Sequence, residues 1–579
     1  MIDEIENILK ELSTEQKNAC ISSSNVILTA CPGSGKTRTL THRLGYQVLK
    51  EPNSRKLKIA ITYTNRAADE IINRLEGMNL DLSSVWTGTI HQFCMHFIIR
   101  PYAMYSKRLC KGYRIIDEDC KKKYGKEIAS DLGIELSKFD DPFNNKVIRI
   151  EYKRLLEKNK EIDFNDILSI SNELLDTCPF ISSNMASIVS SILVDEFQDT
   201  NEYQYQILAN IYKANKSITL MFVGDVNQAI FISLGGIAKK KKELESLYET
   251  TFETMTLKEC YRSSQRLVNL YSRFEISKTN AYSVSKYRDE VGIIQYSDSI
   301  HKKDLASEIA KIIKSELEKG TKAEEICVVA PQWYLLFDFS KNLRLLLPDV
   351  SFNAPDISPI KYDSMNPLYL IARLLFMPAG KNVSLRKRIA NQLILIIRDD
   401  FRINVSDDIQ SYDVLKVINS CRYLDADGII CLKGAIDKVF ELLKISLNQE
   451  TSLLELKTSF FDRISSRVKN HALPTDYESI SKYFVKKNGV VISTIHGVKG
   501  EEYNTIIATG LLNGYLPHWD YIFDKTKKSY RKLETCKLLY VLCSRAKKNL
   551  YLFSECGHRT KGGKDYSATD ELLLIKDMV

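Results

Sequence analysis

The stretch NVILTACPGSGKT, which ends at Thr37, contains groups that can bind the phosphates of a nucleotide. Its apolar part, VILTA, predicts a buried strand, and Gly33 and Gly35 let backbone N–H groups turn toward an anion. Lys36 adds a point charge and Thr37 a hydroxyl for a metal ion, where a helix is predicted over 37–49. Ala30 replaces the first glycine of the GxxxxGK[ST] pattern. The residues predicted to hold the nucleotide are Ala30, Cys31, Pro32, Gly33, Ser34, Gly35, Lys36, Thr37 and Arg38.

A second pattern, SILVDEFQDTNEYQ, delivers two adjacent carboxylates at the end of an apolar strand. Asp195 is predicted to hold Mg²⁺ together with the Thr37 hydroxyl, and Glu196 to polarise an attacking water. An acidic pair on the surface is the alternative, but acidic residues directly after ILV favour a site. With the phosphate loop, the pair predicts an enzyme that hydrolyses a nucleoside triphosphate, with ATP and Mg²⁺ as its cofactors.

The bulk composition sets limits on the class of protein. At 579 residues the chain is too long for one core and predicts about three or four domains. No apolar run approaches the roughly 20 residues that span a bilayer, and the start MIDEIENILKELS is unlike a signal peptide, so we expect a cytoplasmic protein with no membrane partner. The net charge of +9 is compatible with a polyanion. The 13 cysteines include no C-x-x-C pair, which indicates reduced thiols.

Short segments that are apolar throughout predict the fold class. Continuous apolar strands that alternate with helical stretches indicate parallel sheets covered on both faces, with the chemistry at their carboxyl ends. The segments form one group before about residue 230 and another after about 325, so two α/β lobes are expected. The predicted strands are 58–63, 191–196, 220–225, 326–331, 490–494, 505–510 and 549–554.

Two stretches between the strand groups have helical spacing and are predicted to be insertions. The first lobe is expected to comprise 1–97 and 186–259, with a helical insertion at 98–185. The second lobe is expected to comprise 260–349 and 486–579, with a reduced helical insertion at 350–485.

The segment VDEFQDT resembles the DE-x-Q-D motif of superfamily-1A helicases, the UvrD/Rep/PcrA group. Further segments resemble the other motifs of that family, in its order and over nearly the whole chain. They are LSTEQKNA (12–19), YTNRAADEIINR (63–74), TGTIHQFC (87–94), VGDVNQAIF (223–231), CYRSSQRLV (260–268), STIHGVKGEEYNTII (493–507) and KLLYVLCSRAKKNLYLFS (537–554). The family's own phosphate loop has Ala at the position of Ala30, whereas Pro32 is a mild departure. The resemblance implies two RecA-like lobes, each a parallel sheet with a mostly helical insertion.

The resemblance also implies roles at the nucleotide. Arg262 and Arg545 match arginines that reach from the second lobe to the γ-phosphate on the first, and Gln198 and Gln228 match its sensors. For either arginine considered alone, a surface ion pair would be favoured. Three more matched positions contact the base or the ribose: Gln16, Tyr261 and Glu502. Asp199 and Asp225 are interpreted as structural or network-forming residues.

On the nucleic-acid side, the resemblance implies a path across both lobes. Aromatic groups stack on bases with little sequence preference. The matched aromatic positions are Tyr63, Phe93 and Phe231, and the polar groups suited to phosphates are Thr64, Asn65, His91, Thr494 and His496. For each residue alone, a role in the core or in a turn is an equal alternative.

Some features depart from the family pattern. After Phe231 the chain reads ISLGGI, so Ser233 and Leu234 stand where the family has an aromatic residue and an arginine, which puts processive unwinding in doubt. Glu501 stands in place of the more usual leucine. The compact size resembles the helicase subunit of the Gabija antiphage system, which works with an OLD-family nuclease, and so implies a nuclease partner.

The leading interpretation is an ATP-dependent motor that moves 3′→5′ on single-stranded DNA and separates duplex ahead of it, in antiphage defence or DNA repair. The alternative is a regulatory subunit, gated by ATP and DNA, of a defence nuclease complex, with little unwinding of its own. An RNA-directed helicase is disfavoured, because nothing in the chain resembles a single-strand RNA module.

Overall fold

The computed structural model of the 579-residue chain describes residues 2–136, 141–231, 236–354, 358–380, 382–446, 451–485, 489–524, 527–560 and 562–579. Two six-stranded sheets organise it, one in the N-terminal half and one in the C-terminal half. All strand pairs recorded within these sheets are parallel, as the continuous apolar runs predict. The expected α/β class with two RecA-like lobes is confirmed.

The first sheet has the order β3-β2-β6-β7-β1-β8. Its strands are β1 (Val26–Ala30), β2 (Leu57–Thr62), β3 (Val85–Thr89), β6 (Val189–Asp195), β7 (Thr219–Gly224) and β8 (Glu253–Leu257). The helices of this lobe are α1 (Ile2–Leu9), α2 (Thr14–Ile21), α3 (Lys36–Lys50), α4 (Asn65–Glu76), α11 (Glu202–Ala214) and α12 (Lys241–Tyr248). The neighbours β1, β7 and β6 end at the phosphate loop, at Asp225 and at the acidic pair, so the sheet brings the three to one edge.

The second sheet has the order β11-β16-β15-β12-β14-β13. Its strands are β11 (Ile294–Ser297), β12 (Ile326–Ala330), β13 (Phe352–Asn353), β14 (Val490–Thr494), β15 (Tyr503–Ala508) and β16 (Ala546–Phe553). Its helices are α13 (Gln265–Tyr271), α14 (Leu305–Glu318), α15 (Phe337–Leu346), α22 (Trp519–Phe523) and α23 (Arg531–Cys543), and β9 (Glu259–Cys260) pairs with β10 (Tyr282–Ser283) beside it. The two sheets agree with the expected division of the chain into two lobes, and the exact boundaries stay a prediction. One strand of the second sheet, β13, lies past residue 349, where the second insertion was expected to begin.

The first insertion shares its core with the first lobe. Ile99 and Leu168 belong to the same buried cluster as Ile59 and Ile192 of the sheet. Its elements are α5 (Ile90–Cys94), which runs on as a π-helical turn (Met95–Ile99), α6 (Arg100–Tyr102), β4 (Arg114–Ile115), α7 (Glu118–Asp131), α8 (Lys146–Asn159), β5 (Glu161–Ile162), α9 (Phe164–Thr177) and α10 (Pro179–Ile188).

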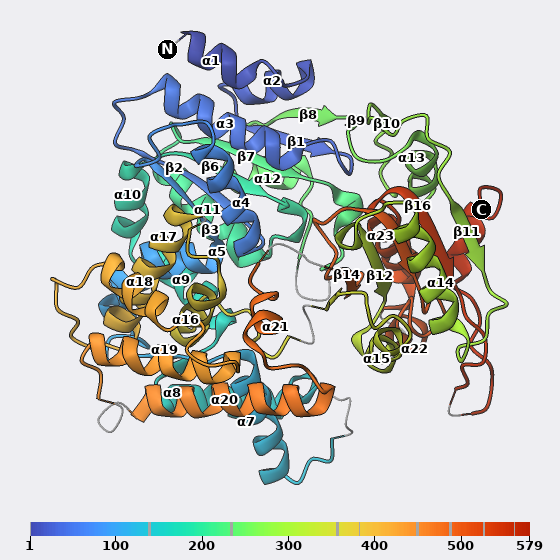
Figure 1. Ribbon diagram of the computed structural model, residues 1–579. Coiled ribbons are helices and arrows are strands. Elements are labelled where there is room, and N and C mark those ends of the chain that lie inside the picture. The colour runs from blue at the N-terminus through green and yellow to red at the C-terminus, as the bar shows by residue number, and fades with distance from the viewer. Residues whose placement is uncertain are drawn as a thin grey trace.

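The second insertion is mostly helical over its described residues and has a buried cluster of its own. Its helices are α16 (Pro367–Phe376), α17 (Val383–Leu395), α18 (Ser411–Ser420), α19 (Gly428–Leu442), α20 (Thr451–His471) and α21 (Tyr477–Ser481). Although it interrupts the second lobe, this gold-to-orange segment lies beside the first lobe and its insertion (Figure 1). Arg100 pairs with Asp400, and Arg114 with Glu455, across this contact. Among the described residues, none of the helices combines the length and apolar character needed to cross a membrane.

Candidate functional site

The phosphate loop connects β1 to α3 through two left-handed glycines. Gly33 has φ of 74° and Gly35, which caps α3, has φ of 81°. A Cβ at Gly35 would lie 2.7 Å from the Gln16 amide nitrogen, and one at Gly33 would lie 2.6 Å from the Arg262 Cβ. Glycine is therefore required at both positions, by backbone conformation and by close packing. The loop is bracketed by Gln16 on one side and by Arg262 of the second lobe on the other.

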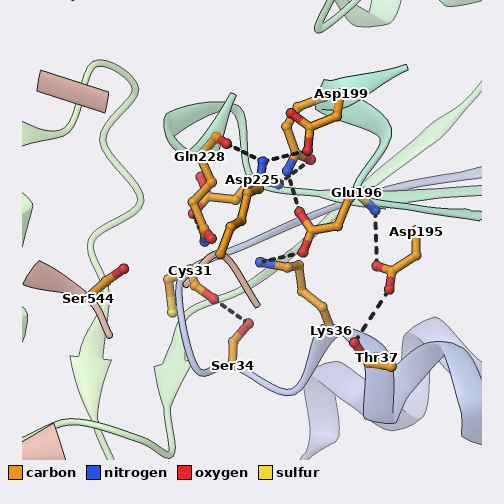
Figure 2. A network of polar contacts seen from close by, with 12 residues as sticks. Cys31, Ser34, Lys36, Thr37, Asp195, Glu196, Asp199, Asp225, Gln228 and Ser544 are labelled. Carbon is orange, nitrogen blue, oxygen red and sulfur yellow. Dashed lines mark hydrogen bonds and ion pairs between the residues drawn. The ribbon is translucent and has the colours of Figure 1, made fainter. Parts of the chain in front are cut away.

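The acidic pair faces this loop from the end of β6 (Figure 2). The Thr37 hydroxyl donates to an Asp195 carboxylate oxygen at 3.4 Å, and Lys36 Nζ lies 3.9 Å from Glu196 Oε1. Glu196 has φ of 53°, a conformation uncommon for a residue with a Cβ, which turns its side chain toward Lys36. The oxygens of Thr37 and Asp195 are the hard ligands that Mg²⁺ prefers, so this donor set fits the ion.

The two carboxyl groups of the pair have opposite pKa shifts. Burial and the neighbouring Glu196 charge raise the pKa of Asp195. Although burial opposes it, Lys36 and Lys499 lower the pKa of Glu196. Glu196 is thereby kept ionised, as a group that orients a water must be.

Two buried glutamines extend the network away from the acidic pair. Gln198 donates to the Glu196 carboxylate, and its side-chain oxygen accepts from the Asp225 backbone N–H at 3.1 Å. Gln228 donates to the Asp225 carboxylate at 2.8 Å. The Glu196 carboxylate is therefore connected through Gln198 and Asp225 to Gln228, in the segment after β7. Asp225 was expected to be a structural or network-forming residue, and its contacts agree with this.

Both arginines of the second lobe lie beside this network. Arg545 is 2% exposed and donates to the Gln228 side-chain oxygen at 3.0 Å and to the Glu501 carbonyl at 3.3 Å. Burial and the neighbouring Arg262 charge lower the pKa of Arg545 to about 9. Arg262 donates to the Glu502 carboxylate at 2.8 Å and to the Ser544 carbonyl at 3.0 Å. Arg262 is thus held by acceptors of the second lobe, whereas Arg545 is held by acceptors of both lobes.

The groups expected at the base and ribose surround the same loop. The Gln16 amide donates to the Ser34 carbonyl at 2.9 Å, and the Tyr261 backbone N–H donates to the Gly33 carbonyl at 2.9 Å with its side chain 44% exposed. Arg38 is paired with Glu11. Glu502, expected at the ribose, pairs with Arg262 and Lys547, which lower its pKa to about 2 although burial opposes them.

Lys499 is a residue of this network that the sequence reasoning missed. Its ammonium donates to Asp199 and to the Gln228 carbonyl, both at 2.5 Å, and lies 4.9 Å from the centre of the Phe231 ring. It thereby contacts the acidic motif, the Gln228 segment and an aromatic residue of the predicted DNA face. The position of Lys499 within the motif HGVKGEEY was the signal that could have drawn attention to it. Its partners lie far away in the sequence, so the motif alone does not predict these contacts.

Three of the residues expected to contact nucleic acid come together at the lobe boundary. Tyr63 stacks on Phe231 with ring centres 4.7 Å apart and an angle of 23° between planes, and His496 lies 5.6 Å from Phe231. They follow β2, β7 and β14, two strands of the first sheet and one of the second. Thr64 caps α4 and Thr494 accepts from the Gly497 N–H, both turn roles, while Asn65 donates to Ser364 at 3.0 Å.

Of two residues after β3 that were expected at the nucleic acid, the structure corrects the interpretation of one. Phe93 is fully buried and packs edge-on against Trp86 and obliquely against Phe97, because it lies on the inner side of α5, so its ring is not available to a base. His91 bonds to the Phe164 backbone, burial lowers its pKa to about 4, and its contact with a phosphate stays a prediction. Ser233 and Leu234 lie outside the described residues.

A cavity of about 240 Å³ lies at the carboxyl edge of the first sheet. Its lining includes Asp195 and Glu196 together with Tyr63, Thr89 and His91. The acidic pair and one ring of the predicted nucleic-acid face therefore border the same cavity.

Comparison with known proteins places this arrangement in a family. The family model described as the UvrD/REP helicase N-terminal domain matches residues 12–149 and 139–249, and the UvrD-like helicase C-terminal domain matches residues 434–555. An ATP-dependent DNA helicase PcrA of Staphylococcus epidermidis is 23% identical over 94% of this chain and 83% of the relative. One from Staphylococcus aureus is 24% identical, with the same coverage. With this network and these matches together, the chain belongs to the UvrD/REP helicase family and is an ATP-hydrolysing helicase.

Proposed function

We propose that the protein is an ATP-dependent motor that moves 3′→5′ on single-stranded DNA and separates duplex ahead of it. The observation that carries the proposal is the hydrogen bond from Arg545 of the second lobe to Gln228 of the first, beside the phosphate loop. A contact that joins the lobes at the nucleotide lets the state of the nucleotide set the angle between them.

The residues of the loop and the acidic pair have distinct roles in this proposal. Lys36 and the backbone N–H groups after Gly33 bind the phosphates, and Glu196 orients the attacking water. Thr37 and Asp195 would hold Mg²⁺, which neutralises phosphate charge when bound. Arg262 and Arg545 stabilise the charge that develops at the transferred phosphoryl group, and Tyr261 offers an exposed ring to the base.

The aromatic face formed by Tyr63, Phe231 and His496 is the proposed site of the DNA strand. Stacking on these rings contributes roughly 1–3 kcal/mol per base and tolerates any sequence. Lys499 links this face to Asp199 and Gln228, so a strand that displaces the Phe231 ring would alter the nucleotide network. The similarity to ATP-dependent DNA helicases supports DNA as the polymer.

Steady-state ATPase and strand-displacement assays on the isolated chain test the proposal. ATP turnover should rise steeply with single-stranded DNA, and a duplex with a 3′ tail should be opened in preference to one with a 5′ tail. A rate that does not respond to DNA would contradict the proposal. Comparing DNA with RNA as the activator distinguishes the polymers.

The nuclease-complex interpretation and the role in antiphage defence stay predictions. The departure ISLGG that favoured a regulatory subunit falls largely outside the described residues. Purification of the native chain tests this interpretation, because a stoichiometric nuclease would favour it and strong unwinding without a partner would contradict it.

A further inference from the structure

A second contact between the lobes involves the segment of the second lobe that contains Glu501 and Glu502. Arg66, in the first turn of α4, forms an ion pair with Glu501, which follows β14. The Arg66 side chain is 67% exposed and that of Glu501 is 21% exposed. An ion pair this exposed is weak and is screened by salt, so it is suited to being made and broken rather than to holding the fold.

Residues 501 and 502 are the acceptors for three guanidinium groups. The Glu501 carboxylate accepts from Arg66 and its backbone carbonyl accepts from Arg545 at 3.3 Å. The next residue, Glu502, accepts from Arg262 at 2.8 Å. A shift of the backbone at Glu501 would therefore move the acceptors of both arginines.

The position of Arg66 on the first lobe makes it responsive to a polyanion. It lies three residues after Tyr63, whose ring forms the aromatic face with Phe231. The helix dipole disfavours a cation in the first turn of a helix, so an anionic group near Arg66 stabilises its position. Glu501 supplies one in this structure, and a strand phosphate arriving at Tyr63 would compete for the same guanidinium.

We propose that the Arg66–Glu501 pair transmits strand binding on the first lobe to the arginines of the second lobe. This inference rests on the proposed function. While the pair is made, Arg66 holds Glu501 near the acceptors of Arg545 and Arg262. A phosphate that takes Arg66 removes this one hold on Glu501, so the segment that carries the two acceptors can shift relative to the first lobe. Glu501 is then a positioning residue.

The test compares ATP turnover and DNA affinity in the full chain carrying Glu501→Gln, Arg66→Ala, or the charge reversal Arg66→Glu with Glu501→Arg. Arg74→Ala is the matched control, because Arg74 forms an exposed ion pair with Glu70 on the same helix and contacts no second-lobe residue through it. Thermal midpoints of all variants establish that they are folded.

Either single substitution should raise the turnover without DNA several-fold and lower the fold-stimulation by DNA, with the rate at saturating DNA unchanged. Glu501→Gln should tighten DNA binding, because the competitor for Arg66 is gone, whereas Arg66→Ala should weaken it. The charge reversal should return turnover without DNA toward the wild-type value yet respond poorly to DNA. The control should match wild type.

Unchanged basal turnover and unchanged stimulation in both single variants would overturn the inference while leaving the motor intact. A charge reversal whose turnover without DNA stays as high as in the two single variants would also overturn it, since restoring an ion pair would then restore no control. A wild-type chain whose turnover ignores DNA would instead overturn the proposed function, and this inference with it.

Discussion

The Arg545 guanidinium of the second lobe donates to the Gln228 side-chain oxygen of the first at 3.0 Å, and both residues are 2% exposed. Gln228 in turn donates to Asp225, which meets Gln198 and through it Glu196. The bond is therefore one end of a continuous polar path from the second lobe to the acidic pair. The path joins side chains of the two lobes by hydrogen bonds alone.

Removal of the Arg545 guanidinium tests that path. In Arg545→Ala, we expect kcat for ATP hydrolysis to fall roughly 10³–10⁵-fold, the range for loss of an arginine that stabilises the transferred phosphoryl group. ATP affinity should change much less, because Lys36 and the loop still bind the phosphates. Steady-state kinetics and nucleotide titration measure the two effects. Arg559→Ala, an exposed arginine of the same lobe, serves as the control.

Glu196→Gln separates water activation from nucleotide binding. The amide keeps the shape of the side chain but cannot accept a proton, so kcat should fall by about 10²–10⁴-fold while ATP still binds. Lys36→Ala should weaken ATP binding as well as turnover. If Glu196→Gln retained full turnover, the assignment of the acidic pair would be wrong.

The aromatic residues give a contrast between surface and core. Phe231→Ala removes a half-buried ring stacked on Tyr63 at the lobe boundary and should weaken single-stranded DNA binding by about 1–3 kcal/mol, measured by fluorescence anisotropy, with a smaller loss of stability than Phe93→Ala. Phe93→Ala empties a fully buried site and should cost about 3–5 kcal/mol of stability. A selective loss of DNA binding in Phe93→Ala would contradict the burial of its ring.

The sequence predicted the centre of each sheet better than its edges. VILTA and VVIST coincide with β1 and β14, because strands covered on both faces are apolar throughout. β8, ETMTL, escaped prediction because it is an edge strand whose first two residues are exposed. Tyr63 and Phe93 looked alike in the sequence, since spacing marks an aromatic residue without telling a core ring from a stacking ring. The contacts of Lys499 join three segments far apart in the chain, so no local pattern could reveal them.

Burial of Glu534 in the first turn of α23 predicts a pH-dependent stability. Burial raises the pKa of this carboxyl from 4.5 to about 7, although Lys537 opposes the shift. Its contribution is present below the unfolded pKa and is lost as the pH rises through the folded pKa. Glu534→Gln should therefore raise the thermal midpoint relative to wild type at about pH 8–9 and make little difference near pH 4. Glu127→Gln, an exposed change on α7, should show no such trend.

The pair between Arg100 and Asp400 should hold the second insertion against the first. Its two hydrogen bonds, 2.9 and 2.7 Å, join side chains that are 15% and 9% exposed. In Arg100→Ala the buried Asp400 charge loses its partner, so stability of this contact should fall by about 3–5 kcal/mol. The loss should be greater at pH 8 than at pH 5, because burial already raises the pKa of Asp400 and protonation relieves the unpaired charge.

Hydrogen exchange of α17 and of residues 396–400 measures that loss locally. This is necessary because a chain of several domains has no single free energy of unfolding. Replacing both partners, Arg100→Met with Asp400→Leu, should restore most of the protection, since no charge is then left buried. Protection that stayed at the wild-type level in Arg100→Ala would mean that apolar packing alone holds the insertion. The insertion would then stay beside the first lobe without help from this ion pair.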